Sequence, residues 1–573
     1  MRRGGDHPLQ FRHRFRVRRP RDSATAHRSL TFRLCQAFRS SRSNPIRSGD
    51  HVDTALSRRT FLGTAAAAAV ALTVVAVPRA RAEVTEERHR AVVIGSGFGG
   101  AITAMHLGRA GVETVVLERG IRWPTGPNAE TFPRMFAPDR RASWLSPMPV
   151  MTGAPPIPSE PYTGLMERVR GNGIDILCGA GVGGSSLAYH GMTLQPDGAR
   201  FAASVSPSLD YDLLDREYYP RVARMLRVAE IPDDLLAHPR YRSSREFLDR
   251  AGREGFDTFR VPMSIDWDFA RRELTGELKP SYTTGDVIYG VNNGGKFSVD
   301  VTYLAAAENT GNVSVAPLHR VTDIERAPNG TWITHVDRIH TDGTILERKR
   351  LLSEAVFLGA GSAGTTRLLM KAHVKNLVPD LPDEVGTGWG NNGDRVFSVT
   401  TPLSSPGEFQ GGPACVGMKD YSDPAGALMI VTGPVPWPAD IGTTSVIGLG
   451  VVRGLGRWQY DAATDDAVLQ WDQKFDRELT RAIETRIRRI AGPAALVVDI
   501  NAVDVNTFHP LGGAPMGPVC DEAGRVLGQR GLYVVDGAKI PGSTGACNPS
   551  MTIAALAEYG ADEIVRRDAG VVF

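Results

Sequence analysis

Two residues near the C-terminal end of the sequence, His509 and Asn548, have side chains suited to handling a proton. They lie in the segments FHPLGG (508–513) and GACNP (545–549), which are rich in small residues. A neutral imidazole can take a proton from a hydroxyl group, and an amide can donate a hydrogen bond to the same oxygen without titrating. Taken singly, each also has a structural interpretation, as a loop histidine and as an asparagine that caps the last helix. The pair is therefore a candidate site for deprotonating an alcohol.

The segment AVVIGSGFGGAITAMHLGRAGVETVVLERG (91–120) predicts a site for an adenine dinucleotide. An apolar strand leads into the turn GSGFGG, which is followed by an amphipathic helix and a second strand ending at Glu118. Gly95 permits the tight turn, Gly97 allows close approach to a pyrophosphate, and Gly100 lets the helix pack against the strand. The helix N-terminus offers N–H groups to phosphates. Glu118 can accept hydrogen bonds from ribose hydroxyls, whereas a plain glycine-rich turn is the alternative.

The first 82 residues are predicted to be a leader rather than part of the fold. Residues 1–50 contain thirteen Arg, no Lys and three Asp without an apolar period, so they cannot bury enough surface to offset their ordering entropy. SRRTFL (57–62) then precedes an apolar stretch, and ARA (80–82) offers a cleavage site. This order is typical of a twin-arginine signal and predicts a secreted or cell-wall protein. An uncleaved anchor helix is the alternative, and a translation start near Val52 would explain the long leader.

The rest of the chain has the opposite charge from the leader. The whole chain carries +3, of which residues 1–50 contribute +10 and residues 51–82 contribute +3, so the chain from Glu83 onward carries −10. An acidic body offers no electrostatic case for binding nucleic acid. Its cysteines are too scattered for a metal site, and no pattern selects a disulfide pair among them: Cys178, Cys415, Cys520 and Cys547.

The body contains further elements typical of a nucleotide-binding fold. The run CGAGVGGSSLAYHGM (178–192) would let the backbone lie against a flat ring system, although a surface loop has the same composition. A second strand, glycine turn and helix begins at Ala355, and we interpret it as a flank of the same cofactor. We also expect strands at 313–315, 321–324 and 444–452, a hairpin at 332–348, and helices at 208–229, 465–491 and 551–567.

These elements predict an α/β protein with a Rossmann-like dinucleotide-binding domain into which an α+β substrate-binding domain is inserted in pieces. A body of about 490 residues is long enough for two domains with sizeable cores. The dinucleotide-binding domain is expected to comprise 83–120, 171–200, 284–375 and 505–573. The discontinuous substrate-binding domain is expected to comprise 121–170, 201–283 and 376–504.

Several segments along the body share one resemblance. They are GSGFGG with Glu118, AGVGGSSLAYHGM, the 287–324 stretch, LGAGSAGTTRLL, EVGTGWGNNG, YDAATDDAVLQW, FHPLGG, and LYVVDG with PGSTGACNPSMTIAALAE. Together they are similar to the glucose–methanol–choline (GMC) oxidoreductases, and most to the cholesterol oxidase branch, which holds FAD without a covalent bond. The similarity runs from about Val92 to Ile564 and covers nearly the whole body.

The resemblance implies both a cofactor site and a reaction. Beside Gly95, Gly97 and Gly100, it implies FAD contacts at Phe98, Gly99, Glu118, Gly184, Met192, Val321 and Gly537. It implies that His509 and Asn548 face the substrate hydroxyl and the flavin. The implied reaction is oxidation of a secondary alcohol, with a 3β-hydroxysteroid such as cholesterol as the expected substrate, followed by reoxidation with oxygen to give hydrogen peroxide.

One departure from the family pattern concerns isomerisation of the steroid double bond. The steroid-oxidising members carry a glutamate in a segment resembling FAEIAPMP, and this glutamate moves a proton during isomerisation. Here Val431 or Thr432 takes its place, and neither side chain can act as that base. The nearest carboxylate, Asp440, lies beyond a proline-rich turn. Isomerase activity is therefore not expected.

Two further departures lie beside the cofactor. Tyr189 and His190 replace the family's Asn-Gly and would crowd the flavin edge. His190 also lies later than the histidine that binds FAD covalently in some relatives, so we expect a non-covalent cofactor. One extra residue precedes Asn548, which makes its reach toward the flavin less direct than that of His509.

The sequence thus predicts an exported FAD-dependent alcohol oxidase with a bulky hydrophobic substrate and oxygen as its partners. Such a substrate implies transient contact with membrane surfaces, and the signal implies the twin-arginine export machinery. The alternatives are an oxidase of a different bulky alcohol, a dehydrogenase that passes electrons to a quinone or another carrier, and a flavin-binding protein that has lost catalysis.

Overall fold

The computed structural model describes residues 84–127, 130–148, 158–402, 405–423 and 426–573. The predicted leader and twin-arginine signal lie outside these residues, and so does the expected translation start near Val52. None of the helices within the described ranges combines the length and the apolar character that a membrane span requires.

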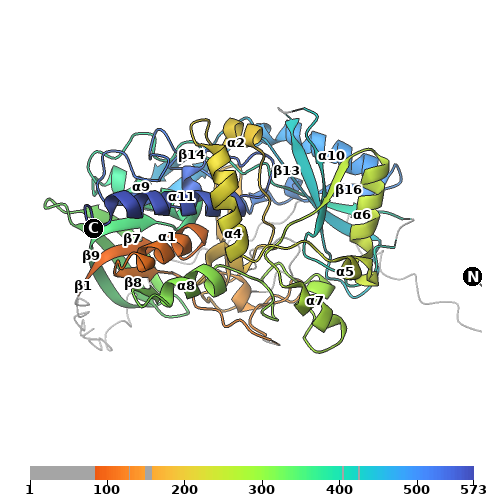
Figure 1. Ribbon diagram of the computed structural model, residues 1–573, viewed down its shortest axis with the longest axis horizontal. Helices are drawn as coiled ribbons and strands as arrows, with labels where there is room; N and C mark the ends of the chain where they lie inside the picture. The colour runs from red at the N-terminus through yellow and green to blue at the C-terminus, as the bar shows by residue number, and fades with distance from the viewer. Residues whose placement is uncertain (1–83, 128–129, 149–157, 403–404, 424–425) are drawn as a thin grey trace, which may run out of the picture. The chain divides into compact units, whose positions relative to one another are not determined.

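A seven-stranded sheet carries the predicted dinucleotide turn (Figure 1). Its strand order is β6-β2-β1-β9-β8-β7, with β18 beside the C-terminal end of β9. The strands β6, β2, β1, β9 and β18 pair in parallel, whereas β7, β8 and β9 form an antiparallel meander. Their bounds are β1 Thr85–Ile94, β2 Thr114–Leu117, β6 Val313–Ala316, β7 His319–Arg326, β8 Trp332–Ile339, β9 Ile345–Leu358 and β18 Leu532–Val534.

Both faces of this sheet are buried, as expected for a parallel sheet covered by helices. Ala91 and Val93 of β1 point into one core, and Val92 and Ile94 point into the other, which follows the two-residue period of a strand. The first core is covered by α1 (Phe98–Arg109), α4 (Tyr219–Met225), α8 (Ala305–Glu308) and α11 (Ser550–Asp568). The second core is covered by α9 (Gly361–Val374).

The second large sheet has six antiparallel strands in the order β16-β10-β13-β12-β11-β5. The helices α6 (Arg242–Arg253) and α10 (Arg477–Ala491) pack on one of its faces through Ala251, Leu479 and Ile483. The other face contributes Val431 and Leu449 to a core shared with Met192. The bounds are β5 Asp257–Arg260, β10 Arg395–Thr400, β11 Val416–Asp420, β12 Leu428–Gly433, β13 Thr443–Gly450 and β16 Leu496–Asp499.

Two small sheets complete the described strands. One contains β3 (Met166–Val169), β4 (Asp175–Gly179) and β17 (Asn506–Thr507), and the other is the hairpin of β14 (Arg457–Asp461) and β15 (Asp466–Gln470). The remaining short α-helices are α2 Gly198–Ser204, α3 Tyr211–Leu213, α5 Asp233–Ala237 and α7 Trp267–Leu274.

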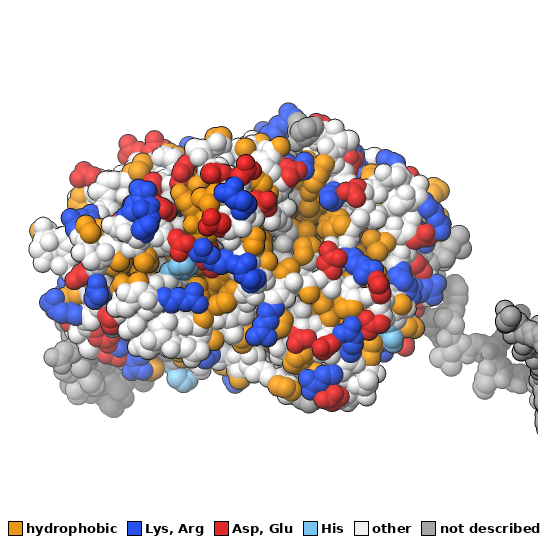
Figure 2. Space-filling model, viewed as in Figure 1, with side chains coloured by type: hydrophobic (Ala, Val, Ile, Leu, Met, Phe, Trp, Pro, Cys, Tyr) orange, Lys and Arg blue, Asp and Glu red, His pale blue; other side chains and the backbone are white. Residues whose placement is uncertain are grey.

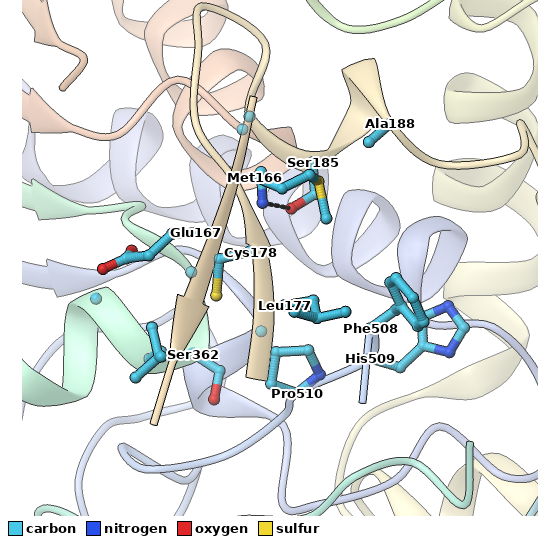
Figure 3. Close-up of a pocket in the computed structure, with 18 of the residues that line it drawn as sticks. Met166, Glu167, Leu177, Cys178, Ser185, Ala188, Ser362, Phe508, His509 and Pro510 are labelled. Atoms are coloured by element: carbon cyan, nitrogen blue, oxygen red, sulfur yellow. Dashed lines mark hydrogen bonds between the residues drawn. The ribbon is translucent and has the colours of Figure 1, made fainter. Parts of the chain in front are cut away.

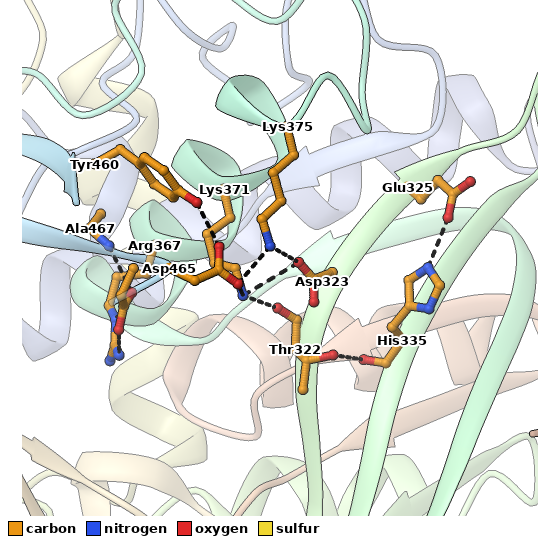
Figure 4. A network of polar contacts seen from close by, with 11 residues as sticks. Thr322, Asp323, Glu325, His335, Arg367, Lys371, Lys375, Tyr460, Asp465 and Ala467 are labelled. Atoms are coloured by element: carbon orange, nitrogen blue, oxygen red, sulfur yellow. Dashed lines mark hydrogen bonds and ion pairs between the residues drawn. The ribbon is translucent and has the colours of Figure 1, made fainter. Parts of the chain in front are cut away.

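Ion pairs connect the β14–β15 hairpin to the seven-stranded sheet and to α9 (Figure 4). Asp465 accepts a hydrogen bond of 2.7 Å from Nζ of Lys375, and Lys375 also lies 3.4 Å from Asp323 of β7. Arg367 of α9 pairs with Asp466 at the start of β15. The hairpin is therefore attached to α9 and, through Asp323, to β7.

Most of the expected elements are confirmed. The strands expected at 313–315, 321–324 and 444–452 correspond to β6, β7 and β13, the hairpin at 332–348 to β8 and β9, and the last helix to α11. The second strand, glycine turn and helix is β9 followed by α9. The parallel sheet with helices on both faces confirms the predicted Rossmann-like class.

Two helix predictions need correction. The helix expected at 465–491 begins only at Arg477, because 466–470 form β15, in which the alternate residues Ala467 and Leu469 are buried. The helix expected at 208–229 spans 211–225 as α3, a π-helical turn and α4. It is not a simple surface helix, because its apolar side joins the core beneath α11.

The predicted domain boundaries stay a prediction. The strands of the seven-stranded sheet come from residues within 85–117, 313–358 and 532–534. Those of the six-stranded sheet come from 257–260 and from residues within 395–499.

On the face shown in Figure 2, basic and acidic side chains are interspersed among apolar ones.

Candidate functional site

The glycine turn after β1 has the geometry that the sequence predicts. Gly95 has φ +92°, and a Cβ at Gly95 would lie 2.4 Å from the carbonyl oxygen of Gly359. A Cβ at Gly100 would lie 2.0 Å from the carbonyl oxygen of Gly95, so α1 packs directly against the end of β1. Gly97 differs, because the nearest protein atom to a Cβ there would be Cα of Gly184, 4.0 Å away. The space beside Gly97 is therefore open.

That open space is part of a cavity of about 770 Å³ whose lining comes from both large sheets. With the exception of Gly100, which is occupied with packing, every predicted site residue lines it: Gly95, Gly97, Phe98, Gly99, Glu118, Gly184, Met192, Val321, His509, Gly537 and Asn548. Figure 3 shows His509 and Phe508 close together on one side, with Glu167 on the opposite side. The fold thus brings the dinucleotide fingerprint and the proton-handling candidates to one cavity.

Glu118 directly follows β2 and is 5% exposed. Its Oε2 accepts hydrogen bonds from the main-chain N–H of Ser96 (3.2 Å) and from the Ser96 hydroxyl (2.6 Å). Its Oε1 accepts from the N–H groups of Gly120 (2.9 Å) and Gly181 (3.3 Å). A carboxylate has about four acceptor positions, so all of them are engaged by the protein. A ribose hydroxyl would need to replace one of these donors, and the Ser96 hydroxyl can turn instead to the carbonyl of Gly181 (3.3 Å).

The small-residue run 178–192 lies against the dinucleotide turn. Gly184 has φ +56°, and a Cβ there would lie 2.8 Å from Cα of Gly97. The hydroxyl of Ser96 accepts a hydrogen bond of 3.0 Å from the N–H of Gly183, which fastens the two loops together. These close contacts require glycine, so the run is a packed cavity wall rather than a surface loop.

Tyr189 and His190, which replace the family's Asn-Gly, both line the cavity. The ring of Tyr189 meets that of Phe98 edge to face at 5.5 Å, and its hydroxyl bonds to that of Ser264. Burial, aided by the charges of Lys296 and His509, lowers the pKa of His190 to about 4, so His190 is neutral at ordinary pH. Burial also lowers the pKa of Lys296 to about 7, and its ammonium donates to the carbonyls of Leu187 and Tyr189.

His509 follows the short strand β17 and is held by its own segment. Its N–H donates to the hydroxyl of Thr507 (3.0 Å). Its ring atom Nδ1 is buried and lies 3.5 Å from Oδ2 of Asp394 without forming a hydrogen bond, and among the described residues Nε2 forms none either. The ring is 18% exposed, which leaves one edge open to the cavity. His509 is therefore oriented with one nitrogen toward Asp394 and the other free for a ligand.

Asn548 is 2% exposed, and its amide is fully bonded to the protein. Its nitrogen donates to the carbonyl of Met192 and to the hydroxyl of Ser550, both at 2.8 Å, and its oxygen accepts from Leu194 (3.1 Å). The expected capping role is wrong, because α11 has Pro549 at the N-cap position and no side chain accepts a hydrogen bond from the free N–H groups of its first turn. A catalytic role stays a prediction, and it requires one amide hydrogen to leave its present partner.

The positions aligned with the isomerisation glutamate do not face the cavity. Val431 and Thr432 lie in the middle of β12, are buried in the sheet, and are absent from the lining. Asp440 is in an exposed turn, where it accepts a hydrogen bond of 2.9 Å from the N–H of Gly442. None of the three supplies a base to the site.

The sequence analysis assigned no role to several acidic side chains in the lining, among them Asp536 and Asp394. Asp536 lies two residues after the last strand, β18, and accepts hydrogen bonds from Thr365 (2.6 Å) and Gly361 (2.8 Å), and burial raises its pKa to about 6. It connects the second glycine turn to the cavity. Asp394 directly follows the segment GWGNNG and lines the cavity. Its position between a glycine-rich loop and a strand is the sequence feature that could have indicated a place in the site.

The described cysteines form no disulfide. Cys178 lines the cavity, and burial raises the pKa of its thiol to about 12. Within the described ranges, no group of three or more His, Cys, Asp or Glu side chains is arranged to hold a metal ion.

Comparisons with known proteins agree with this architecture. Residues 461–557 match the C-terminal family model described as GMC oxidoreductase. A cholesterol oxidase from Mycobacterium tuberculosis is 26% identical over 556 residues, which cover 82% of this chain and 90% of the relative. A cholesterol oxidase from Acinetobacter baumannii is 22% identical over 557 residues, which cover 82% and 92%. An uncharacterized GMC-type oxidoreductase from M. tuberculosis is 25% identical over 538 residues, which cover 84% and 77%.

Solved structures show the same fold at lower sequence identity. The crystal structure of pyridoxine 4-oxidase from Mesorbium loti superposes with a TM-score of 0.60 at 14% identity and covers 84% of this chain and 99% of that one. A fungal aryl-alcohol oxidase superposes with a TM-score of 0.57 at 15% identity, with coverage of 83% and 99%. The resemblance predicted from the sequence motifs is thereby confirmed: residues 461–557 match the C-terminal model of the GMC oxidoreductases, and most of the chain is similar to proteins named cholesterol oxidase.

Proposed function

We propose that this protein is an FAD-dependent oxidase of a secondary alcohol, with a 3β-hydroxysteroid such as cholesterol as substrate and oxygen as electron acceptor. The observation that carries the proposal is the position of His509, whose free ring edge lines the same cavity as the dinucleotide turn. The names of the two cholesterol oxidase relatives support the sterol, and both are distant in sequence.

The cavity residues fit FAD. The side chain missing at Gly97 leaves space that no protein atom fills, beside the N-terminus of α1, where N–H groups suit a pyrophosphate. Glu118 can accept a ribose hydroxyl when the Ser96 hydroxyl turns to the carbonyl of Gly181, and Gly184, Met192, Val321 and Gly537 line the remaining walls. Bound FAD would supply the hydride acceptor for the alcohol carbon.

In this proposal the protein's own part is to take the proton. Nε2 of His509 accepts the hydroxyl proton of the alcohol, because Nδ1 faces Asp394 and is not available. His190, neutral at ordinary pH, lines the same cavity and adds no positive charge that would oppose protonation of His509.

We expect oxidation without isomerisation of the double bond. Val431, Thr432 and Asp440 all fail to present a base to the cavity. Cholesterol should therefore be converted to the 5-en-3-one and released before the double bond moves.

The test is an oxygen-electrode and peroxide assay on purified protein with cholesterol, followed by spectroscopy of the steroid product. We expect a flavin spectrum, equal amounts of oxygen consumed and peroxide formed, and the 5-en-3-one as product. Reduction of an artificial dye without peroxide would indicate a dehydrogenase instead. Intact flavin with no turnover of sterols or other alcohols would overturn the oxidase proposal.

Export by the twin-arginine machinery is part of the same proposal. The basis is the SRRTFL segment and the apolar stretch that follows it. We expect mature protein that begins near Glu83 in the cell wall or medium, and none there in a host that lacks the twin-arginine translocase. Mass spectrometry of the exported species checks both points.

A further inference from the structure

The carboxylate of Asp394 has no part in the reaction proposed above, although it lies beside the residue that would take the proton. Asp394 is 2% exposed and directly precedes β10. Its Oδ2 lies 3.5 Å from Nδ1 of His509. A carboxylate at this depth is costly unless polar partners surround it.

Those partners come from the segment that carries His509. Oδ2 of Asp394 accepts a hydrogen bond of 3.0 Å from the N–H of Phe508 and lies 3.4 Å from the hydroxyl of Thr507. The same hydroxyl accepts the N–H of His509 at 3.0 Å. Asp394 therefore anchors the two residues that precede His509 and fixes where the main chain enters the imidazole position.

The loop before Asp394 is itself fixed. The N–H of Asp394 donates to the carbonyl of Asn391 (3.2 Å), and Nδ2 of Asn391 donates to Asp476 (2.9 Å). The next residue, Asn392, binds the carbonyl of Cys547 (2.7 Å) beside Asn548. One short loop thus sets the positions of both proton-handling candidates.

The other charged groups near the ring do not substitute for this carboxylate. His190, across the cavity, is held neutral by burial. Lys296 faces His190 and the carbonyls of Leu187 and Tyr189. Arg395 is turned to Asp476, with which it forms a buried ion pair. Among the described residues, Asp394 is the acidic group within ion-pair distance of His509.

We propose that Asp394 is the positioning residue for His509: it keeps the ring hydrogen on Nδ1, directs Nε2 to the substrate, and stabilises the ring after it takes the proton. The substrate O–H bond breaks, its proton forms a bond to Nε2, and Asp394 stays unprotonated throughout. The inference rests on the proposed alcohol oxidation. The 3.5 Å contact is longer than a hydrogen bond, as catalytic contacts commonly are before a substrate binds.

The first test needs no turnover. In protein labelled with ¹⁵N-histidine, the neutral His509 ring should show its hydrogen on Nδ1, with the signal assigned by its loss in His509→Gln. In Asp394→Asn, which keeps an acceptor for Phe508, the amide can donate to Nδ1, so the population with the ring hydrogen on Nδ1 should fall. A hydrogen on Nε2 in the native protein, or an unchanged tautomer in the variant, would overturn the proposal.

The second test uses the pH dependence of kcat/KM in the flavin-loaded enzyme. In Asp394→Asn we expect kcat/KM to fall about a hundredfold at neutral pH and its acidic limb to move to lower pH. A merely structural role would lower the activity equally at every pH. The matched control is Asp499→Asn, which removes one negative charge beside Arg395 and keeps the acceptor for Asn501 (2.9 Å).

The outcomes separate this inference from the proposed function. Asp499→Asn should leave both the ring tautomer and the acidic limb in place, and an equal change in both variants would mean that Asp394 acts only through general charge. If the native, flavin-loaded protein oxidises no alcohol, the proposed function fails, and the NMR measurement of the tautomer still decides whether Asp394 orients His509.

Discussion

Two parts of the cavity are built differently. One is the dinucleotide turn after β1, and the other is the wall formed by His509, Asn548 and the residues that contact them, which we call the His509 wall. At the turn, the backbone decides the geometry: Gly95 and Gly100 are required because the chain itself lies 2.0–2.4 Å from where their side chains would be. At the wall, the side chains decide it, through contacts between Asp394, Thr507 and His509, and between Asn548 and Met192. The turn is a local structure of a few residues, whereas the wall joins segments more than a hundred residues apart.

This difference teaches which substitutions affect binding and which affect chemistry. A substitution in the turn alters the space for a cofactor or the packing of α1. It does not affect proton transfer directly, because the turn contributes no proton acceptor. A change in the wall alters a proton acceptor or its orientation and leaves the cofactor space intact. The predictions below test this separation, beginning with the largest expected effect.

His509→Ala should lower kcat by about a thousandfold, because it removes the group that takes the proton. The flavin content and the melting temperature should stay close to those of the native protein, since the ring is partly exposed to the cavity. Turnover by stopped-flow and the flavin absorbance measure the two quantities. Full turnover in this variant would remove His509 from the mechanism.

Gly97→Val should lower the bound flavin at least tenfold while the protein stays folded. The new side chain has no protein neighbour closer than Gly184 at 4.0 Å, so it projects into the cavity. Gly100→Val should instead prevent folding, because its Cβ would meet the carbonyl of Gly95 at 2.0 Å. Gly252→Ala is the control, since nothing lies within 4 Å of its Cβ. Flavin absorbance and circular dichroism distinguish the three, and normal flavin content in Gly97→Val would contradict the assignment.

His106→Gln should reduce stability below pH 6.5 and have little effect above pH 9. Burial of His106 in α1 opposes its charge, but hydrogen bonds with Asp562 and Glu558 of α11 raise its pKa to about 9. A raised pKa gives stability that is complete below the unfolded value near 6.5 and is lost as the pH rises through 9. The contribution is about 3 kcal/mol.

Urea unfolding of the native protein and His106→Gln at pH 6 and pH 9.5 measures this contribution. The difference between the two proteins should shrink as the pH rises. A difference that stays constant would mean that the ring acts by packing alone.

Asn548→Ala should lower the free energy of unfolding by about 2 kcal/mol, because the buried N–H of Leu194 loses its acceptor. Turnover should fall about tenfold, since Met192, which lines the cavity, keeps only the Ser550 hydroxyl as a partner of its carbonyl. In Asn548→Asp the acceptor for Leu194 is kept and both donors are lost. Comparing the two variants in thermal melts and in turnover shows which half of the amide matters. An unchanged kcat in both would leave Asn548 a structural residue.

The same contrast explains what could be predicted from the sequence. The turn was predicted in detail, because the spacing of Gly95, Gly97 and Gly100 is a local pattern. The strand before it, the helix after it and the acidic residue at the end of the next strand are enough to recognise it. The place of His509 in the cavity was predicted through the family resemblance. Its contact with Asp394 was not, since these two residues are 115 positions apart and no local pattern connects them.

The errors have similar causes. Residues 465–476 contain apolar residues at a spacing that fits a helix, and only the pairing of β15 with β14 makes 466–470 a strand. Asn548 precedes α11 as a capping residue would, yet Met192 and Leu194 from a distant segment engage its amide instead. In both cases a long-range partner decided between two local alternatives of similar stability.

The seven-stranded sheet joins residues from near both ends of the described part of the chain, which has a consequence for how the protein is made. The central strand β1 pairs with β9, the sheet is completed by β18, and α11 closes over α1 through the His106 contact. A ribosome that has synthesised only the first half of the chain therefore presents α1 with an uncovered apolar side and β1 without its neighbour β9. The sheet cannot be completed until β18 and α11 have been synthesised, so a cofactor can be enclosed only after that point.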